Sequence, residues 1–153
     1  KGFDTRSIGR FAAGRHWRRA SKRQLEEYQR LFDIFVVKSS AQRLYDYASE
    51  RLEIRDVRKA DGSNGDVIVF SHFIRRSGPP VRFDWRVRAN GEGHKIVDVM
   101  VEGISMVITQ RAVFNSVIRE SGGNFDGLIA ALRQQTLMTL AADHFSNFNR
   151  SSR

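Results

Sequence analysis

The stretch that decides the fold runs from Ile96 to Leu132, IVDVMVEGISMVITQRAVFNSVIRESGGNFDGLIAAL. It begins as a long β-rich run with one interruption at Glu102-Gly103, and at Thr109 the spacing of its apolar residues becomes helical. That helix is predicted to end at Gly122-Gly123, because glycine adopts the positive φ of a helix C-cap at little cost. A second helix is predicted to begin near Asp126. The stretch holds no catalytic motif, and the arrangement of its apolar residues is typical of a cavity wall.

Three further strands are predicted before this stretch. Residues 52–59 alternate loosely, residues 66–74 are apolar on both sides, and residues 81–88 alternate cleanly between apolar and charged side chains. The last strand is expected to span about residues 95–108, with Gly103 as a bulge that lets it curve. Because short turns join the four strands in sequence, they predict an antiparallel meander.

Helices are predicted on both sides of the strands. Residues 3–13 fit a short helix, and Ser21 to Gln24 has the form of a capping box. A long amphipathic helix follows, bent near Ser39-Ser40 and continuing toward Tyr47, and the chain past Gln134 also has helical spacing. The expected class is α+β: a curved four-stranded antiparallel meander sheet with helices packed on one face.

Length and composition indicate a single folded domain over residues 1–153, with residues from about 146 to 153 frayed. The chain is 41% hydrophobic and 28% charged, as in globular proteins, and no apolar run reaches the roughly 20 residues of a membrane span. Its start lacks a signal-peptide pattern, so we expect a leader to have been removed. The absence of cysteine excludes disulfides, thiolate-bound zinc, iron–sulfur clusters and thiol catalysis.

The chain is strongly basic, with 26 Lys and Arg against 17 Asp and Glu. The excess lies early in the chain, at Arg6, Arg10, Arg15, Arg18, Arg19, Lys22 and Arg23. Such a surface attracts polyanions, although a solvated basic face explains it equally well. Nucleic-acid binding, with Trp17 stacking on a base, is the rival interpretation. No nucleic-acid-binding signature accompanies it, and the aromatic residues follow a core pattern.

Candidate catalytic groups are few. The four histidines share no metal-ligand spacing, and His72, in a strand, is best interpreted as structural. Asp98 and Glu102 lie four apart on a strand and could form an acid–base pair of a hydrolase. The simpler interpretation pairs Asp98 with Arg86 or Arg88 of the neighbouring strand, while Glu102 fixes the bulge. We therefore predict no catalytic residues and no metal site.

The apolar residues allow either a solid core or a hollow one. Phe occurs 11 times, and a curved sheet packed with helices can enclose a space suited to acyl chains. Each buried methylene is worth roughly 0.8 kcal/mol, so two chains of about 15 methylenes would represent some 20 kcal/mol or more. Periodicity does not distinguish a packed core from a hollow one.

The order of these elements resembles the MlaC family, the toluene-tolerance-type periplasmic phospholipid-binding proteins. The resemblance rests on short segments distributed over most of the chain: Phe3-Asp4, Ile8, Gly14, Trp17-Arg18, Ala20-Ser21, Gln24, Tyr28, Leu31-Phe32, Leu44, Pro79-Pro80-Val81, Trp85, Asp98, Glu102-Gly103, Ile104-Ser105 and Asp126-Gly127-Leu128-Ile129. Ser39-Ser40, where the family often has an aromatic residue, and a longer step at Asn124-Phe125 depart from the pattern and leave the lipid's identity open.

The resemblance implies a non-enzymatic periplasmic shuttle that carries phospholipid between the outer and inner membranes, in a cone-shaped α+β fold. It implies an inner-membrane ABC transporter complex and an outer-membrane lipoprotein complex as partners, no nucleic acid, and no cofactor besides the lipid cargo. The alternatives are a hopanoid-associated carrier of the same family and a basic nucleic-acid or scaffold module with a solid core.

On this hypothesis the acyl chains lie in an internal apolar pocket. The residues expected to line it are Phe32, Phe35 and Val36 on the long helix and Phe83, Trp85, Val87, Val99, Val101 and Ile104 on the sheet. The phosphate would lie near the mouth, with arginines among Arg82 to Arg88 or in the first helix as candidate contacts.

Overall fold

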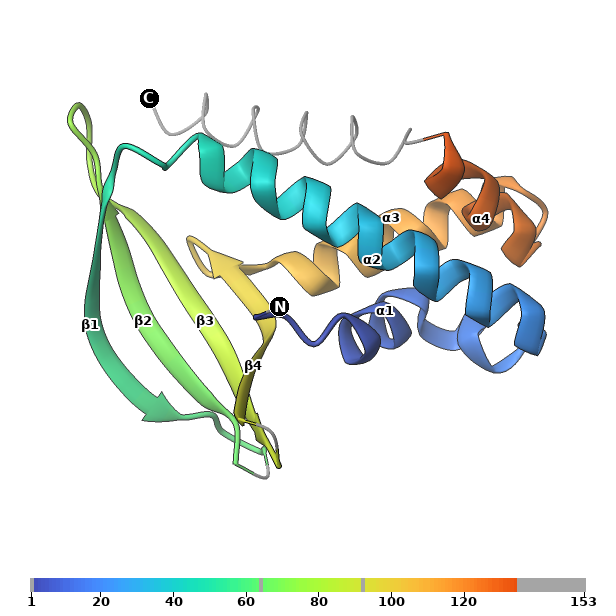
Figure 1. The fold of residues 1–153 in the computed structure, drawn as a ribbon, viewed down its shortest axis with the longest axis horizontal. Helices are drawn as coiled ribbons and strands as arrows, with labels where there is room; N and C mark the ends of the chain where they lie inside the picture. Colours follow the sequence, from blue (N-terminus) through green and yellow to red (C-terminus); the bar gives the residue numbers. More distant parts are fainter. Residues whose placement is uncertain (1, 64, 92, 135–153) are drawn as a thin grey trace. The chain divides into compact units, whose positions relative to one another are not determined.

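The structure is a computed structural model that describes residues 2–63, 65–91 and 93–134 (Figure 1). Its elements are α1 (Thr5–Ala13), the 3-10 helix η1 (Gly14–Arg18), α2 (Lys22–Tyr45), β1 (Arg51–Lys59), β2 (Val67–Ile74), β3 (Val81–Asn90), β4 (Gly93–Val101), β5 (Ile104–Ser105), α3 (Met106–Glu120) and α4 (Phe125–Arg133). The α+β class is confirmed. The helix predicted past Gln134 and the frayed end lie outside the described residues.

The chain divides into two compact units. The sheet unit contains the described residues within 1–8 and 44–109, and the helical unit those within 9–43 and 110–153. The single domain and the helices packed on one face around a cavity stay predictions. No helix in the described part of the chain is long and apolar enough to cross a membrane.

The sheet unit is an antiparallel meander in the strand order β1-β2-β3-β4-β5, and its strands follow one another across a curved sheet (Figure 1). Two irregularities interrupt the register. Arg55 is an extra residue in β1 opposite β2, and Val97 is an extra residue in β4 opposite β3. Such bulges bend a strand and increase its local twist, which accounts for part of the curvature.

The predicted count of four strands is wrong, because the last one ends much earlier than expected. Glu102 and Gly103 have φ of 49° and 81°, so they form a two-residue hairpin turn instead of a bulge. Val101 pairs with Ile104 across this turn, which gives the short fifth strand. Helix α3 then begins at Met106, where a continuing strand was predicted.

Two side-chain oxygens cap the N-terminus of α3, which explains why the helix begins here. Ser105 acts as its N-cap, accepting a hydrogen bond from the backbone N–H of Ile108 at 3.1 Å. Asp98 of β4 accepts another from the N–H of Val107 at 3.1 Å. These acceptors satisfy two of the free N–H groups that every helix start leaves, so the apolar β-branched residues that follow become helical.

The helical unit has an aromatic core. Phe32 and Phe35 of α2 each lie 6.0 Å, centroid to centroid, from Phe114 of α3, and Tyr28 lies 5.3 Å from Phe125 of α4. The remaining core side chains are aliphatic and come from three helices: Ala12, Ala13, Ile118, Leu128, Ile129 and Leu132.

The predicted helix ends of this unit are confirmed. In the capping box before α2, Ser21 Oγ accepts from the N–H of Gln24 at 3.2 Å, and Gln24 Oε1 accepts from the N–H of Ser21 at 2.9 Å. After α3, Gly123 has φ of 83° and its N–H donates to the carbonyl of Ile118 at 2.8 Å. Asn124 is the N-cap of α4, accepting from the N–H of Asp126.

Candidate functional site

One face of the sheet is apolar on every strand, apart from Ser71 in β2 and Lys59 at the end of β1, which pairs with Val67. The register aligns Val57, Val69, Trp85 and Val99 in one row, and Ile54, Ser71, Phe83, Val101 and Ile104 in the next. Two outer rows add Leu52, Phe73 and Val81 on one side and Val67, Val87 and Ile96 on the other. All six strand residues predicted to contact lipid therefore share one face, which we call the apolar face.

The bulges keep this face apolar. Residues two apart share a face in a regular strand, so Ile54 would share its face with Asp56. The extra residue in β1 changes the spacing to three and brings Val57 onto the apolar face instead. The extra residue in β4 likewise places Ile96 on the same face as Val99.

The apolar face is unevenly covered. Phe83 and Val101, in the middle strands, are 8% and 4% exposed, whereas Ile54 and Val57 on β1 are 66% and 55% exposed. Trp85, Val87 and Val99 are half-buried, and Ile104 is exposed. The apolar face thus continues from a buried centre to an edge that is open to solvent.

A series of rings crosses the buried part of this face. The centroid of Tyr47, which follows α2, lies 4.9 Å from that of Phe73 and 5.2 Å from that of Phe83, and Phe83 stacks on Trp85 at 5.9 Å. Burial raises the pKa of Tyr47, with the positive charge of Arg75 opposing the shift. The sequence analysis missed Tyr47, because it assigned this residue to the end of the long helix.

The three helical candidates lie together on α2. Phe32 and Phe35 are 1% and 7% exposed and pack on each other with centroids 6.0 Å apart, while Val36 is half-buried. Both rings also pack against Phe114, so protein side chains already occupy much of their surface. Their contact with lipid stays a prediction.

The opposite face of the sheet is charged and paired within itself. Arg82, Arg86 and Arg88 alternate with the apolar residues of β3 and therefore point to this charged face. Arg82 Nε donates to Asp84 Oδ2 at 2.8 Å, and Asp84 is 2% exposed. These arginines point away from the face on which acyl chains are expected, which disfavours them as headgroup contacts.

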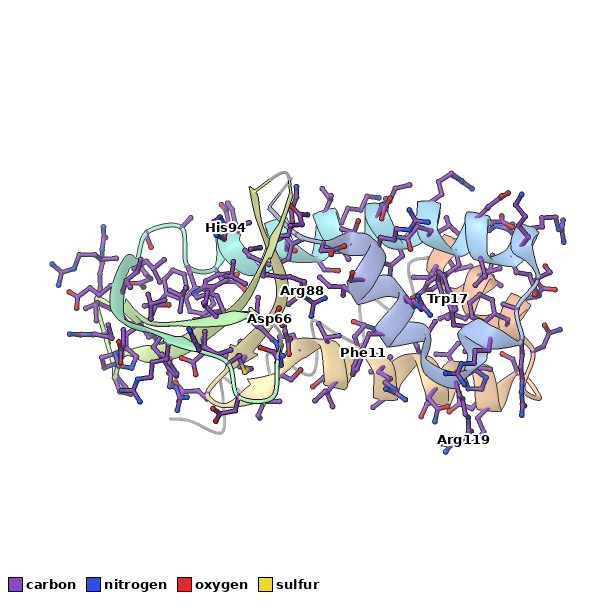
Figure 2. The ribbon with its side chains drawn as sticks, turned by 90° about the horizontal axis from the view of Figure 1, so that it is seen from below. Phe11, Trp17, Asp66, Arg88, His94 and Arg119 are labelled. Atoms are coloured by element: carbon purple, nitrogen blue, oxygen red, sulfur yellow. The ribbon has the colours of Figure 1, made fainter. Side chains whose placement is uncertain are left out.

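Asp66 holds the other two arginines. Arg86 Nε donates to its Oδ2 at 2.7 Å, and Arg88 donates through Nε to Oδ1 at 2.8 Å and through Nη2 to Oδ2 at 3.0 Å. Figure 2 shows Arg88 and Asp66 side by side. Hydrogen bonds from Arg88, with a smaller contribution from Arg86, lower the pKa of Asp66 although its burial opposes the shift.

The carboxylates considered as a hydrolytic pair have structural partners. The predicted pairing of Asp98 with Arg86 or Arg88 is wrong, because those arginines bond to Asp66 and Asp98 accepts from Ser105 Oγ and from two backbone N–H groups. Glu102 lies in the turn between β4 and β5, and its Oε1 accepts from the backbone N–H of Arg82 in β3 at 2.7 Å. The geometry therefore assigns both groups to the start of α3 and the hairpin.

Two of the histidines, His72 and His16, lie among polar side chains. His72 lies on the charged face, opposite Glu53 and Arg82 in the register, and His16 Nε2 lies 2.9 Å from Asn115 Oδ1. Across residues 2–63, 65–91 and 93–134, no three His, Asp or Glu side chains gather in a way that could hold a metal ion.

The chain matches a known protein family. The family model described as MlaC protein matches residues 1–134. The chain belongs to the MlaC family. A solved structure of a phospholipid-binding protein from Ralstonia solanacearum, in complex with a phospholipid, is similar to this MlaC-family chain with a TM-score of 0.74. The two are 26% identical, and the match covers 92% of this chain and 76% of the Ralstonia one.

Proposed function

We propose that this MlaC-family chain is a carrier that binds phospholipid without covalent chemistry and shuttles it through the periplasm between the outer and inner membranes. The observation that carries the proposal is the apolar face, which crosses every strand and stays partly exposed. It is supported by family membership and by the phospholipid held by the similar Ralstonia protein.

The acyl chains lie against the apolar face, and the carrier removes the main barrier to their passage through water. Transfer of a lipid into water exposes its tails at roughly 0.8 kcal/mol per methylene. Contact with Trp85, Val87 and Val99, which are half-buried, offsets that cost without any bond being made or broken. Phe83 and Val101 form the floor of the same face, and Ile104 its exposed end. Within the helical unit, Phe32, Phe35 and Val36 are proposed as further lipid contacts.

Membership of the MlaC family supports two protein partners. An outer-membrane lipoprotein complex and an inner-membrane ABC transporter complex exchange lipid with the carrier at the two ends of its path. The cargo is phospholipid, with a hopanoid-type lipid as the alternative.

Native mass spectrometry of the purified protein, followed by solvent extraction and lipid analysis, tests the proposal. We expect a discrete added mass that resolves into intact phospholipid. A hopanoid in the extract would change the cargo but keep the carrier. A bare polypeptide mass that persists after incubation with lipid vesicles would overturn the proposal, and recovery of lysolipid or free fatty acid would contradict the absence of chemistry.

A pair of substitutions on one strand tests the location of the tails. Val99→Trp adds bulk to the apolar face, next to Trp85, whereas Met100→Trp adds bulk to the charged face. We expect Val99→Trp to lose bound lipid and Met100→Trp to keep it, with both variants folded by circular dichroism. Equal lipid occupancy in the two variants would remove the apolar face around Val99 from the binding site.

A further inference from the structure

A basic surface covers the start of the helical unit. From Thr5 to Leu25 the chain contains no Asp or Glu but eight Lys, Arg or His residues. Six of the cations belong to the helical unit and are exposed: Arg10, Arg15, Arg18, Arg19, Lys22 and Arg23. We call these six residues the basic corner.

The 3-10 helix η1 holds part of the basic corner in a fixed orientation. Trp17 packs edge-on against Tyr28 with centroids 6.2 Å apart, and His16 Nε2 lies 2.9 Å from Asn115 Oδ1 of α3. Because residues three apart lie on the same side of a 3-10 helix, Arg15 and Arg18 share the opposite, exposed side. Trp17 and His16 thus anchor the helix, while Arg15 and Arg18 are exposed to solvent.

The first turn of α2 adds cations where a helix disfavours them. Lys22 and Arg23 occupy this turn, no acidic residue accompanies them, and the capping box uses the neutral Gln24. The positive end of the helix dipole repels these charges. Within the described ranges the ion pair on this surface joins Lys22 to Glu26 at 3.9 Å, with side chains 92% and 69% exposed, so it compensates little. A bound anion would relieve this repulsion.

An exposed ring lies beside the cations. Phe11 of α1 is 44% exposed, and the guanidinium of Arg111 from α3 lies 4.9 Å from its ring centroid. Arg111 also contacts the turn after α1, where Gly14 has φ of 59° and where a side chain would come within 3.0 Å of Arg111 Nε. The basic corner is therefore bordered by an aromatic side chain with a cation fixed on it.

We propose that the basic corner docks on an anionic phospholipid bilayer. The inference rests on the proposed function, because a lipid carrier exchanges its cargo at membranes. Charge complementarity supports it: a bilayer presents many phosphates at once, which suits six exposed cations without a shaped pocket. An exposed aromatic ring beside cations fits the boundary between headgroups and acyl chains. The lack of Asp and Glu in this segment also suits an acidic protein, and a failure to bind either vesicle type would favour that partner instead.

Vesicle flotation tests the docking. The full chain is mixed with vesicles of phosphatidylcholine alone or with about 30% phosphatidylglycerol, at NaCl concentrations from about 50 to about 500 mM to vary the screening. The test variant is Arg15→Gln/Arg18→Gln/Arg19→Gln. The matched control, Arg30→Gln/Lys38→Gln/Arg76→Gln, removes the same charge from other exposed positions.

We expect binding to the anionic vesicles that weakens with salt, and a loss of about a hundredfold in the test variant, since each cation near an anionic surface contributes about fivefold. The control should lose much less. No binding to the anionic vesicles, equal binding to both vesicle types, or an equal loss in both variants would overturn the inference. Native mass spectrometry of the same samples separates the two proposals: bound lipid without vesicle docking contradicts the basic corner alone, and absent lipid contradicts the carrier.

Discussion

The indole N–H of Trp85 donates a hydrogen bond of 2.8 Å to the Oγ of Ser71, across the β2–β3 pair. Ser71 is 1% exposed, and its own hydroxyl donates to the carbonyl of Phe83 at 2.8 Å. One hydroxyl therefore accepts from the indole and donates to the backbone. It fixes the largest side chain of the apolar face while satisfying every polar group involved.

Ser71→Ala should lower the free energy of unfolding by about 1–3 kcal/mol, because it leaves the indole N–H without an acceptor in a mostly apolar setting. Urea unfolding measures the loss. In a Trp17→Phe background, the emission of Trp85 should also change, since the ring is no longer held. Ser77→Ala, in the exposed β2–β3 connection, is the control and should have no effect. A Ser71→Ala variant as stable as the parent would show that the hydroxyl contributes nothing to the sheet.

Asp66→Asn should destabilise the fold at neutral pH by about 2–3 kcal/mol, because a buried carboxylate would lose charged hydrogen bonds from Arg86 and Arg88. The pH dependence follows from the lowered pKa of Asp66. The native state favours the ionised form, so its contribution is full above the unfolded pKa of about 3.9 and is lost as the pH falls through the lower, native pKa.

Chemical unfolding of the wild type and of Asp66→Asn from neutral pH down to about pH 2 checks this expectation. The gap between the two stabilities should stay constant above about pH 5 and close below about pH 4. Asp56→Asn is the control: Arg58 also lowers the pKa of Asp56, but that pair is exposed and should contribute much less. A gap that stays open in acid would mean that packing, and not charge, links Asp66 to the arginines.

Gly103→Ala should cost about 1–2 kcal/mol, since Gly103 has φ of 81°, which a residue with Cβ adopts only under strain. No heavy atom lies within 4 Å of the Cβ position, so the cost comes from the backbone alone. Gly91→Ala in the neighbouring hairpin has the same open surroundings without the positive φ, and should be neutral or slightly stabilising. Thermal unfolding of both variants measures the difference, and equal melting temperatures would contradict a left-handed turn at Gly103.

The alternation from Val81 to Arg88 predicted the apolar face correctly, because period 2 places Phe83, Trp85 and Val87 on one side whatever their neighbours are. The end of the last strand could not be predicted. A glycine with positive φ serves a bulge and a tight turn equally well, and Ile104 to Ile108 has the β-branched composition of a strand. Only the capping by Ser105 and Asp98, which needs the folded sheet, starts a helix there.

The candidate site also depends on contacts that only the folded chain makes, and these could not be predicted from the sequence. Asp98 and Arg86 were predicted to be cross-strand neighbours, and the register confirms this. Their ion pair was wrong because Asp66, which is twenty residues from Arg86 in the sequence, accepts its hydrogen bond instead. The role of Ser71 could not be predicted, because a serine within a strand is common in any sequence. Its importance becomes clear only from the hydrogen bond that it accepts from the indole of Trp85. Helical spacing identified Phe32 and Phe35 as inward-facing residues, but spacing does not tell a packed ring from one that contacts lipid.

Tyr28→Phe should test the link between α1 and α2. Tyr28 is fully buried, and its hydroxyl donates to the carbonyl of Gly9 at 2.7 Å. Removal of the hydroxyl keeps the stacked rings but leaves that carbonyl without its partner, so we expect a loss of about 1–3 kcal/mol at neutral pH. Tyr45→Phe is the control, because Tyr45 is 81% exposed and should tolerate the change.

The alkaline limb of the same experiment separates the hydrogen bond from the packing. Burial raises the pKa of Tyr28 well above its ordinary value, so the native state retains a proton that the unfolded chain releases near pH 10. The wild type should therefore lose stability as the pH rises above about 10, through a reaction that Tyr28→Phe cannot undergo. The gap between the two proteins should narrow there, whereas Tyr45→Phe should follow the wild type. A gap of constant size up to the highest pH at which unfolding is reversible would mean that the hydroxyl of Tyr28 ionises equally well in the folded chain.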